Sequence, residues 1–369
     1  MQSTSNAVAA GAQVALEPNR PAVGLVPRKL WIAAIATTLA YPVSINLFVS
    51  SYHAARTHDS IGGIAWGLSA IAALVLVCAS PMLALRCLYA IRLATTSHAI
   101  AARRLLHTAV AAPPLYLLSG RISGLLIPLF GQTASGLIVW WGIWFVVTLL
   151  VWNGARREAS GDESRHPSLT LSSTRVRRIH RAAVVALVVA FLALHLANHL
   201  TALWSVASQR ALMLALRSWY RAVWMEPVIL GLFVVAAVSG LVRLSRLTRN
   251  AADGWRVLQT ASAAYLACFL VSHLWATLGA RYRGIDPDWA FATGGKAGLL
   301  ATDWSTAVLV YYAFVLLALT VHAGLGLRMV LLSRRMPTLA ANRAARLTTV
   351  VGGVISILIV AALLGVRLH

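Results

Sequence analysis

The sequence predicts an all-α polytopic membrane protein with about nine transmembrane helices. Three observations lead to this prediction: 59% of the 369 residues are hydrophobic, only 11% are charged, and the mean hydropathy is +0.75. A soluble domain is usually about one quarter charged, so this chain has too little polar surface to coat a globule in water. Lipid therefore has to cover much of the molecule.

Apolar runs of about 20 residues, the length that crosses a bilayer core as an α-helix, recur along the chain. The third run is the least regular, because Pro113, Pro114 and Arg121 interrupt it and neighbouring helices must satisfy the backbone groups that proline frees. The first run follows no basic leader, so we interpret it as a retained helix and not as a secretory signal. The expected spans lie near residues 30–50, 63–85, 105–127, 134–153, 182–203, 225–242, 257–279, 305–327 and 347–366.

Lys and Arg residues are distributed unevenly between the two sides of these spans. Of the 32, 23 fall on the side of the N-terminus and nine on the other side. The positive-inside rule then places the N-terminus in the cytoplasm and the C-terminus outside, in a bacterial inner (cytoplasmic) membrane. This topology explains the net charge of +22, which in a soluble protein would indicate nucleic acid.

A polar, arginine-rich stretch divides the chain into two parts. Residues 208–224 combine arginines with aromatic residues, which is typical of an amphipathic helix on the outer surface or of an ordered loop with interfacial aromatics. The expected organisation is a flexible cytoplasmic tail at 1–25, a four-helix membrane region of unassigned role at 26–155, a cytoplasmic linker at 156–181 and a five-helix bundle at 182–369.

Two intramembrane histidines are expected at matched depth. His195 and His273 each lie 17 residues after a cytoplasmic arginine, Arg178 and Arg256, which is roughly 25 Å along a helix. Their helices run in the same direction, so the imidazoles can face each other across a bundle core and ligate one haem near the outer leaflet. Alternatively, they only form hydrogen bonds to neighbouring helices. Small residues would leave room for the macrocycle, or only allow close packing: Ala190, Ala193, Ala197, Ser262, Ala263, Ala264, Ala267 and Ser272.

A further histidine, His322, lies six residues before Arg328 and is expected near the inner leaflet. The equivalent position on the sixth span is Ala237, so no histidine faces it from there, although His107 or His180 could approach it from the inner side. The cysteines form no CxxC motif, and we expect neither metal binding nor a disulfide from them. They are Cys78, Cys87 and Cys268.

Six short motifs follow one another in the back half, between residues 175 and 366. They are RRIH (177–180), HLANH (195–199), MEP (225–227), WRVLQ (255–259), SHLWAT (272–277) and YYAFVLLALTVHAGLGL (311–327). In order and spacing they resemble the membrane anchor of respiratory complex II, the di-haem cytochrome b of succinate dehydrogenases and fumarate reductases. The resemblance implies His195 and His273 as ligands of an outer haem b. It also implies His322 as one ligand of an inner haem, whose partner position falls at Ala236 or Ala237. The first four spans lie outside the resemblance.

Glu226 is the one carboxylate expected at a span end facing the bundle. Its neighbours Trp224, Met225 and Pro227 are apolar, so burial would favour its neutral form and make it a usable proton carrier. Alternatively, it only interacts with the dipole of its helix. Since the resemblance implies quinone chemistry near the outer haem, we hypothesise that Glu226 exchanges protons with a quinone. His199 would hold a haem propionate or the quinone, or act as an alternative ligand.

Two classes of function therefore compete. The first is an electron-transfer cytochrome b, whose basic cytoplasmic face docks acidic iron–sulfur or flavoprotein subunits. The chain contains no dinucleotide-binding glycines, P-loop or CxxC, so at most it is the membrane subunit of a quinone-linked oxidoreductase. The second is a haem-free transporter, or an assembly or anchor protein, whose histidines relay protons or only pack.

Overall fold

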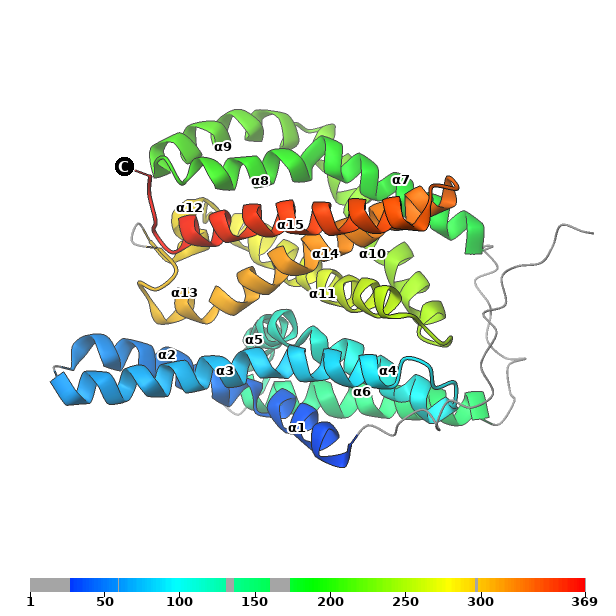
Figure 1. Cartoon of the computed structure of the whole chain (residues 1–369). Coiled ribbons are helices and arrows are strands. Elements are labelled where there is room, and N and C mark those ends of the chain that lie inside the picture. Colours follow the sequence, from blue (N-terminus) through cyan, green and yellow to red (C-terminus); the bar gives the residue numbers. More distant parts are fainter. Residues whose placement is uncertain (1–26, 59, 131–135, 160–172, 296–297, 369) are drawn as a thin grey trace, which may run out of the picture.

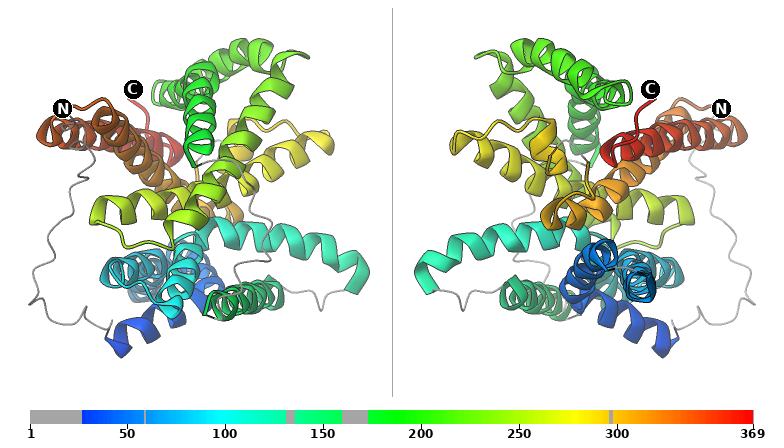
Figure 2. Two further views of the ribbon diagram at one scale, coloured as in Figure 1. Left: turned by 90° about the vertical axis from the view of Figure 1, so that its right-hand side faces the viewer. Right: turned by 90° about the vertical axis from the view of Figure 1, so that its left-hand side faces the viewer.

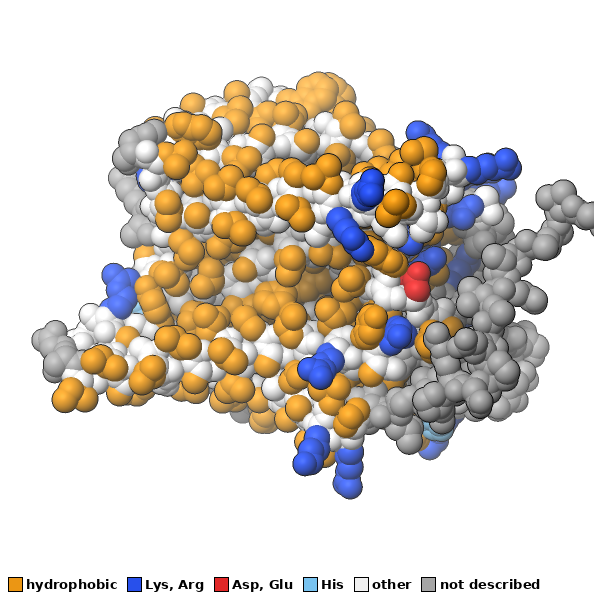
Figure 3. All heavy atoms as spheres, viewed as in Figure 1, with side chains coloured by type: hydrophobic (Ala, Val, Ile, Leu, Met, Phe, Trp, Pro, Cys, Tyr) orange, Lys and Arg blue, Asp and Glu red, His pale blue; other side chains and the backbone are white. Residues whose placement is uncertain are grey.

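The computed structural model describes residues 27–58, 60–130, 136–159, 173–295 and 298–368, and every regular element in these ranges is a helix. Seven helices are long and apolar enough to cross a membrane, and the number is nine if each of two bent helix pairs forms one span. The chain is therefore an all-α polytopic membrane protein, as the sequence predicts. Hydrophobic side chains cover the middle of the visible surface, and basic side chains gather toward one end of it (Figure 3).

The front half contains two sharply bent helix pairs, α1–α2 at 62° and α4–α5 at 74°. Proline explains both breaks, because it lacks the N–H that continues a helix and clashes with the preceding turn. Pro42 lies in the first turn of α2, and Pro113 and Pro114 lie in that of α5. The helices are α1 (Arg28–Leu39), α2 (Tyr41–Thr57), α3 (Ser60–Ala90), α4 (Ser97–Val110), α5 (Ala112–Phe130) and α6 (Gly136–Ala159).

The bend before α5 changes the expected third span. We expected one helix over residues 105–127, but α5 lies across the bundle while α4 runs along it (Figures 1 and 2). The two consecutive prolines redirect the chain at Ala111. As a result, α5 points toward the back half and packs against α11.

The back half contains five long helical spans, as expected, and one of them includes a π-helical turn. The elements are α7 (Ser173–Leu187), the π-helical η3 (Val188–Leu192), α8 (Ala193–Thr201), α9 (Val206–Tyr220), α10 (Met225–Leu247), α11 (Gly254–Tyr282), α12 (Trp289–Thr293), α13 (Asp303–Ala307), α14 (Leu309–Ser333) and α15 (Thr338–Leu363). Helices α7, η3 and α8 form one continuous span, and α13 continues into α14.

Most of residues 208–224 belong to helix α9, which agrees with the helical interpretation of this segment and not with an ordered loop. It begins after Ser205, whose hydroxyl accepts a hydrogen bond of 2.9 Å from the backbone N–H of Ser208, a regular N-cap. The helix interpretation is therefore the right one. The expected linker at 156–181 is shorter than predicted, because α6 continues to Ala159 and α7 already begins at Ser173. The remainder of that linker and the expected tail at 1–25 lie outside the described residues.

The two halves of the chain share one packed core. The largest cluster of buried side chains is built on α2, α3, α4 and α6, and it also includes Val257 and Ala261 of α11. A second connection lies at the end of the molecule that carries α12, α13 and the C-terminus, called the α12 end below (Figure 1). There His53 of α2 lies 3.3 Å from a carboxylate oxygen of Asp303 and 3.2 Å from the hydroxyl of Thr306. The front half therefore packs against the five-helix bundle.

Candidate functional site

A cavity of about 600 Å³ lies inside the back half, within the size range of small-molecule and cofactor sites. Residues of η3, α8, α9, α10, α11, α12, α14 and α15 line it, and most of these side chains are aromatic or aliphatic. Tyr116 and Arg121 of the crosswise helix α5 complete the wall. The sequence alone assigned no role to the front half, whereas the structure shows that it contributes to the wall of this cavity.

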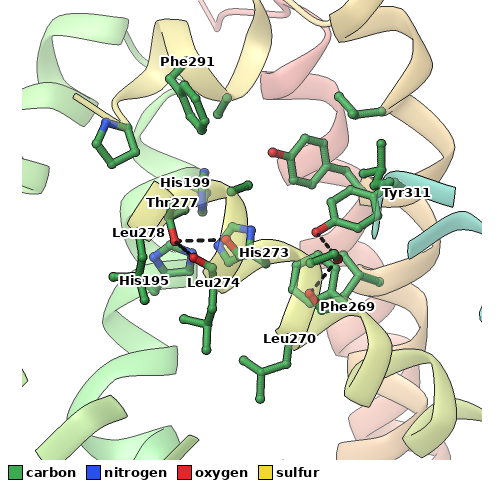
Figure 4. A pocket seen from close by; sticks show the side chains of 18 of the residues that line it. His195, His199, Phe269, Leu270, His273, Leu274, Thr277, Leu278, Phe291 and Tyr311 are labelled. Atoms are coloured by element: carbon green, nitrogen blue, oxygen red, sulfur yellow. Dashed lines mark hydrogen bonds between the residues drawn. The ribbon is translucent and has the colours of Figure 1, made fainter. Parts of the chain in front are cut away.

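Three of the histidines expected at the site converge in this cavity. The ring centroids of His195 on α8 and His273 on α11 lie 6.4 Å apart, with 69° between the ring planes. The ring of His199 lies 4.7 Å from that of His195 and perpendicular to it. Figure 4 shows the three rings pointing toward one another from the two helices. The two histidines that the depth count places at one level therefore lie next to each other in the structure.

Each of the two facing histidines stacks on a phenylalanine one helical turn before it. The centroids of Phe191 and His195 lie 5.0 Å apart at 19°, and those of Phe269 and His273 lie 5.0 Å apart at 14°. Both pairs belong to the same sequence pattern, FLxxH, whose i to i+4 spacing places the two rings on one helix face. This repeated pattern is a signal that the depth count did not use.

Other aromatic rings hold the two phenylalanines in place. Phe191 contacts Tyr220 and Phe233 edge to face, at 5.4 and 5.6 Å between centroids, and Phe269 lies 4.9 Å from Tyr311. Neither His195 nor His273 forms a ring hydrogen bond with any residue that the structure describes. Stacking, and not hydrogen bonding, therefore sets the orientation of both imidazoles.

The spacing of these two rings fits axial ligation of one haem iron. Two metal–nitrogen bonds of about 2.0 Å, with about 1.2 Å from each nitrogen to its ring centre, separate two axial imidazole centroids by roughly 6.4 Å. The observed separation of 6.4 Å agrees with this value. Across the described residues no group of three or more His, Cys, Asp or Glu side chains is arranged to hold a metal ion, so a pair of imidazoles is the donor set available here.

The small residues expected to make room for a macrocycle do not shape this cavity. Of the eight, only Ser272 lines it. Ser262 and Ala264 are buried in helix packing, and the Ser262 hydroxyl contacts His322 instead. The cavity is lined instead mainly by larger aromatic and aliphatic side chains.

Glu226 lies at the cavity with different neighbours from those expected. Its carboxylate forms a two-point ion pair with the guanidinium of Arg281 on α11, with one N–O distance of 3.2 Å. A guanidinium favours the charged form of a carboxylate, in contrast to the apolar surroundings that we expected. Its sequence neighbours Trp224 and Met225 do not form this contact, since Arg281 is 55 residues away along the chain.

A second ion pair anchors α9 to the loop after α11. Arg217 lies 2.7 Å from a carboxylate oxygen of Asp286, and it donates a hydrogen bond of 3.1 Å to the carbonyl of Pro287. The hydrogen bond from Arg217 holds the pKa of Asp286 below its usual value. The two ion pairs position Arg217 and Arg281, which both line the cavity.

His322 lies away from this cavity, and the position expected to face it has another neighbour. Its Nδ1 lies 3.2 Å from the hydroxyl of Ser262. At the expected partner position, the carbonyl of Ala236 lies 3.2 Å from Nδ1 of His180, which also contacts the hydroxyl of Ser239 at 3.0 Å. His180 therefore contacts the backbone at Ala236, the position where the resemblance implies a second ligand of the inner haem.

His107 is not available as a partner for His322. Its Nδ1 lies 2.6 Å from the carbonyl of Arg103, and its Nε2 lies 2.9 Å from the hydroxyl of Thr260. Both ring nitrogens are therefore committed to packing between α4 and α11. The cysteines Cys78, Cys87 and Cys268 are all free thiols.

Comparison of the chain with protein-family profiles, with curated proteins and with solved structures found no match.

Proposed function

We propose that this protein is a membrane cytochrome b that exchanges electrons with quinone through one haem b held by His195 and His273. The observation that carries the proposal is the spacing of the two imidazoles, 6.4 Å between centroids, across an otherwise mainly apolar cavity. When bound there, a haem supplies a one-electron carrier whose potential depends on its axial ligands and on the burial of the site.

The residues around the histidines have roles that suit this proposal. Phe191 and Phe269 hold the imidazoles in fixed orientations, so little ordering is needed when the iron binds. The aromatic lining excludes water and keeps the local dielectric low. His199 lies one turn beyond His195 and serves as an additional polar group in the cavity.

We propose that the chain acts as the quinone-linked membrane subunit of a larger oxidoreductase, similar to a complex II anchor. It would reside in the bacterial inner membrane with the N-terminus in the cytoplasm, as the excess of basic residues on that side indicates. The same basic face would dock acidic iron–sulfur or flavoprotein subunits. The resemblance in motif order supports this assignment. A second haem at His322 is not part of the proposal, because the cavity does not reach that residue.

The haem itself is tested by purifying the full chain in mild detergent from cells that supply haem. We expect a dithionite-reduced minus oxidised spectrum of the b type and about one haem per chain in a pyridine haemochromogen assay. Reduction of this haem by a quinol analogue would support the quinone assignment. A purified, folded chain without haem would contradict the proposal and favour a haem-free transporter or an assembly and anchor protein.

Glu226 is the proposed proton-exchanging group, because reduction of a quinone takes up two protons along with two electrons. Since the ion pair with Arg281 favours the charged carboxylate, we propose that Glu226 takes up a proton when that ion pair opens. Its side chain lines the cavity and is 26% exposed. Replacing Glu226 with glutamine is expected to slow quinone reduction by about 10²-fold or more, with haem content unchanged. The matched control is Asp303→Asn, a carboxylate at the same end that does not line the cavity. Equal rates and equal pH dependence for Glu226→Gln and the unmodified protein would refute the role.

A further inference from the structure

Unpaired buried polar atoms gather at one side of the cavity. In the described part of the chain, nine buried side-chain nitrogen and oxygen atoms have no hydrogen-bond partner, and five of them belong to residues that line this cavity. Buried polar groups nearly always have a partner, so five such atoms beside one cavity indicate that a polar ligand group completes them. The five are Asn198 Oδ1, His199 Nδ1, Gln209 Oε1, Arg217 Nε and Trp289 Nε1.

These atoms come from three elements that meet at the α12 end. Asn198 and His199 end the transmembrane part of α8, Gln209 and Arg217 lie on α9, and Trp289 begins α12. The side chains of Asn198, Gln209 and Trp289 are at most 6% exposed. The unpaired N–H groups of Arg217 and Trp289 are fixed donors and favour a ligand group that accepts hydrogen bonds, whereas the amide oxygens of Asn198 and Gln209 are acceptors and do not bind the same group.

The charge around the cavity favours a negative ligand group. Four arginines line it, of which Arg281 is paired with Glu226 and Arg217 with Asp286, and the other acidic residue of the lining is Asp288. Arg121 and Arg221 form no salt bridge with any acidic residue in the described ranges. The positive charges of Arg217 and Arg281 repel Arg221, and the negative charge of Asp286 attracts it. An anion among these groups would relieve that repulsion.

These arginines lie on the side of the membrane where basic residues are expected to be few. The expected topology assigns only nine of the 32 basic residues to this side of the membrane. Positive residues are depleted on the outer side of membrane proteins, so arginines gathered around one cavity there require a local reason. The ion pairs with Asp286 and Glu226 supply it for Arg217 and Arg281, but Arg121 and Arg221 form no such ion pair in the described part of the chain.

We infer that the groove between α8, α9 and α12 is a carboxylate-binding subsite of the cavity, formed by Arg217 and Trp289 with Arg221 beside them. Building on the proposed function, the carboxylate belongs to the edge of the haem, whose propionates would then face the α12 end. A separate amphiphile with a carboxylate head, such as a fatty acid, has the same chemistry and is distinguished by the experiment.

The experiment compares haem with its dimethyl ester, in which both carboxylates are blocked. The full chain is produced in cells starved of haem, and binding of each compound is followed by absorbance in detergent. We expect the ester to bind about tenfold or more weakly, because each lost charge-assisted hydrogen bond removes a substantial share of the affinity. Equal binding of haem and ester, together with no binding of palmitate to the haem-free chain, would overturn the subsite.

Two variants identify the residues, each with a matched control. Trp289→Phe removes one indole N–H at the subsite, and Trp140→Phe removes an equally buried, unpaired indole N–H in the front half. Arg217→Gln removes the buried guanidinium, and Arg210→Gln removes an exposed arginine of the same helix that does not line the cavity. We expect faster transfer of haem to a haem-scavenging protein for Trp289→Phe and Arg217→Gln only. Transfer rates unchanged in both would contradict the assignment.

Binding of haem, its ester and palmitate, measured separately, distinguishes failure of the subsite from failure of the cytochrome proposal. Weak ester binding, with Arg217→Gln affecting haem but not the ester, assigns the carboxylate to haem. If haem and ester bind equally and palmitate binding depends on Arg217, the carboxylate belongs to a separate amphiphile. That result still supports the subsite. If neither haem nor ester binds, the cytochrome proposal fails. The palmitate measurement then decides the subsite alone: dependence on Arg217 supports it, and no binding overturns it.

Discussion

Replacing either His195 or His273 with alanine is expected to abolish the b-type spectrum of the purified protein. Each substitution removes one of the two proposed axial nitrogens, whose rings lie 6.4 Å apart. The loss should appear as less than about one tenth of the haem per chain, with the monodisperse elution of the folded protein retained. In the corresponding glycine variants, added imidazole should restore part of the spectrum, because the cavity then has room for a free ring.

Two other histidines serve as controls for that result. His322→Ala and His107→Ala remove buried rings whose nitrogens contact Ser262 in the first case and Arg103 and Thr260 in the second. Both variants should keep the haem. His199→Ala is the more demanding comparison, since its ring lies only 4.7 Å from His195. Retention of the spectrum in His195→Ala together with its loss in His199→Ala would transfer the ligand assignment to His199.

Replacing Gly324 with leucine is expected to disrupt packing of α14 against α15. A Cβ at this position would lie 2.5 Å from the hydroxyl of Thr349 and 2.8 Å from the carbonyl of Ala345, and the carbonyl cannot move without shifting α15. Small residues at such crossings let transmembrane helices approach closely. We expect destabilisation of about 1–3 kcal/mol or more. It should be measured as a lower temperature of half-aggregation in detergent and a lower yield.

The control for Gly324 lies two residues further along the same helix. A Cβ at Gly326 would meet nothing within 4 Å, so Gly326→Leu introduces the same side chain without a clash. Its stability should stay close to that of the unmodified protein. Similar losses for both variants would show that leucine on this helix, and not the close contact at Gly324, causes the effect.

The sequence predicted depth within the membrane well and predicted lateral contacts poorly. Counting from Arg178 and Arg256 placed His195 and His273 at one level, because a spanning helix converts residue number into height almost linearly. Partners at equal height depend on how helices tilt, bend and rotate. The ion pair between Glu226 and Arg281 joins residues 55 positions apart, and no local sequence pattern predicts it.

The front half shows the same limit. Its prolines predicted an irregular third span, but they gave neither the 74° bend nor the direction of α5. Only that direction brings Tyr116 and Arg121 to the cavity. The helices themselves were predictable because apolar runs of spanning length leave few alternatives in lipid.

The π-helical turn η3 divides the first span of the back half into two segments, α7 and α8, whose packing faces point in different directions. A π turn inserts one extra residue, which rotates everything beyond it by about 100° relative to an uninterrupted α-helix. Before the turn, α7 presents its packing surface to α10, and beyond it α8 turns His195 to the cavity and packs against α9 and α15. One continuous span thereby packs against α10 with one face and directs His195 into the cavity with another. The π-helical residues 188–192 set the angle between these two faces.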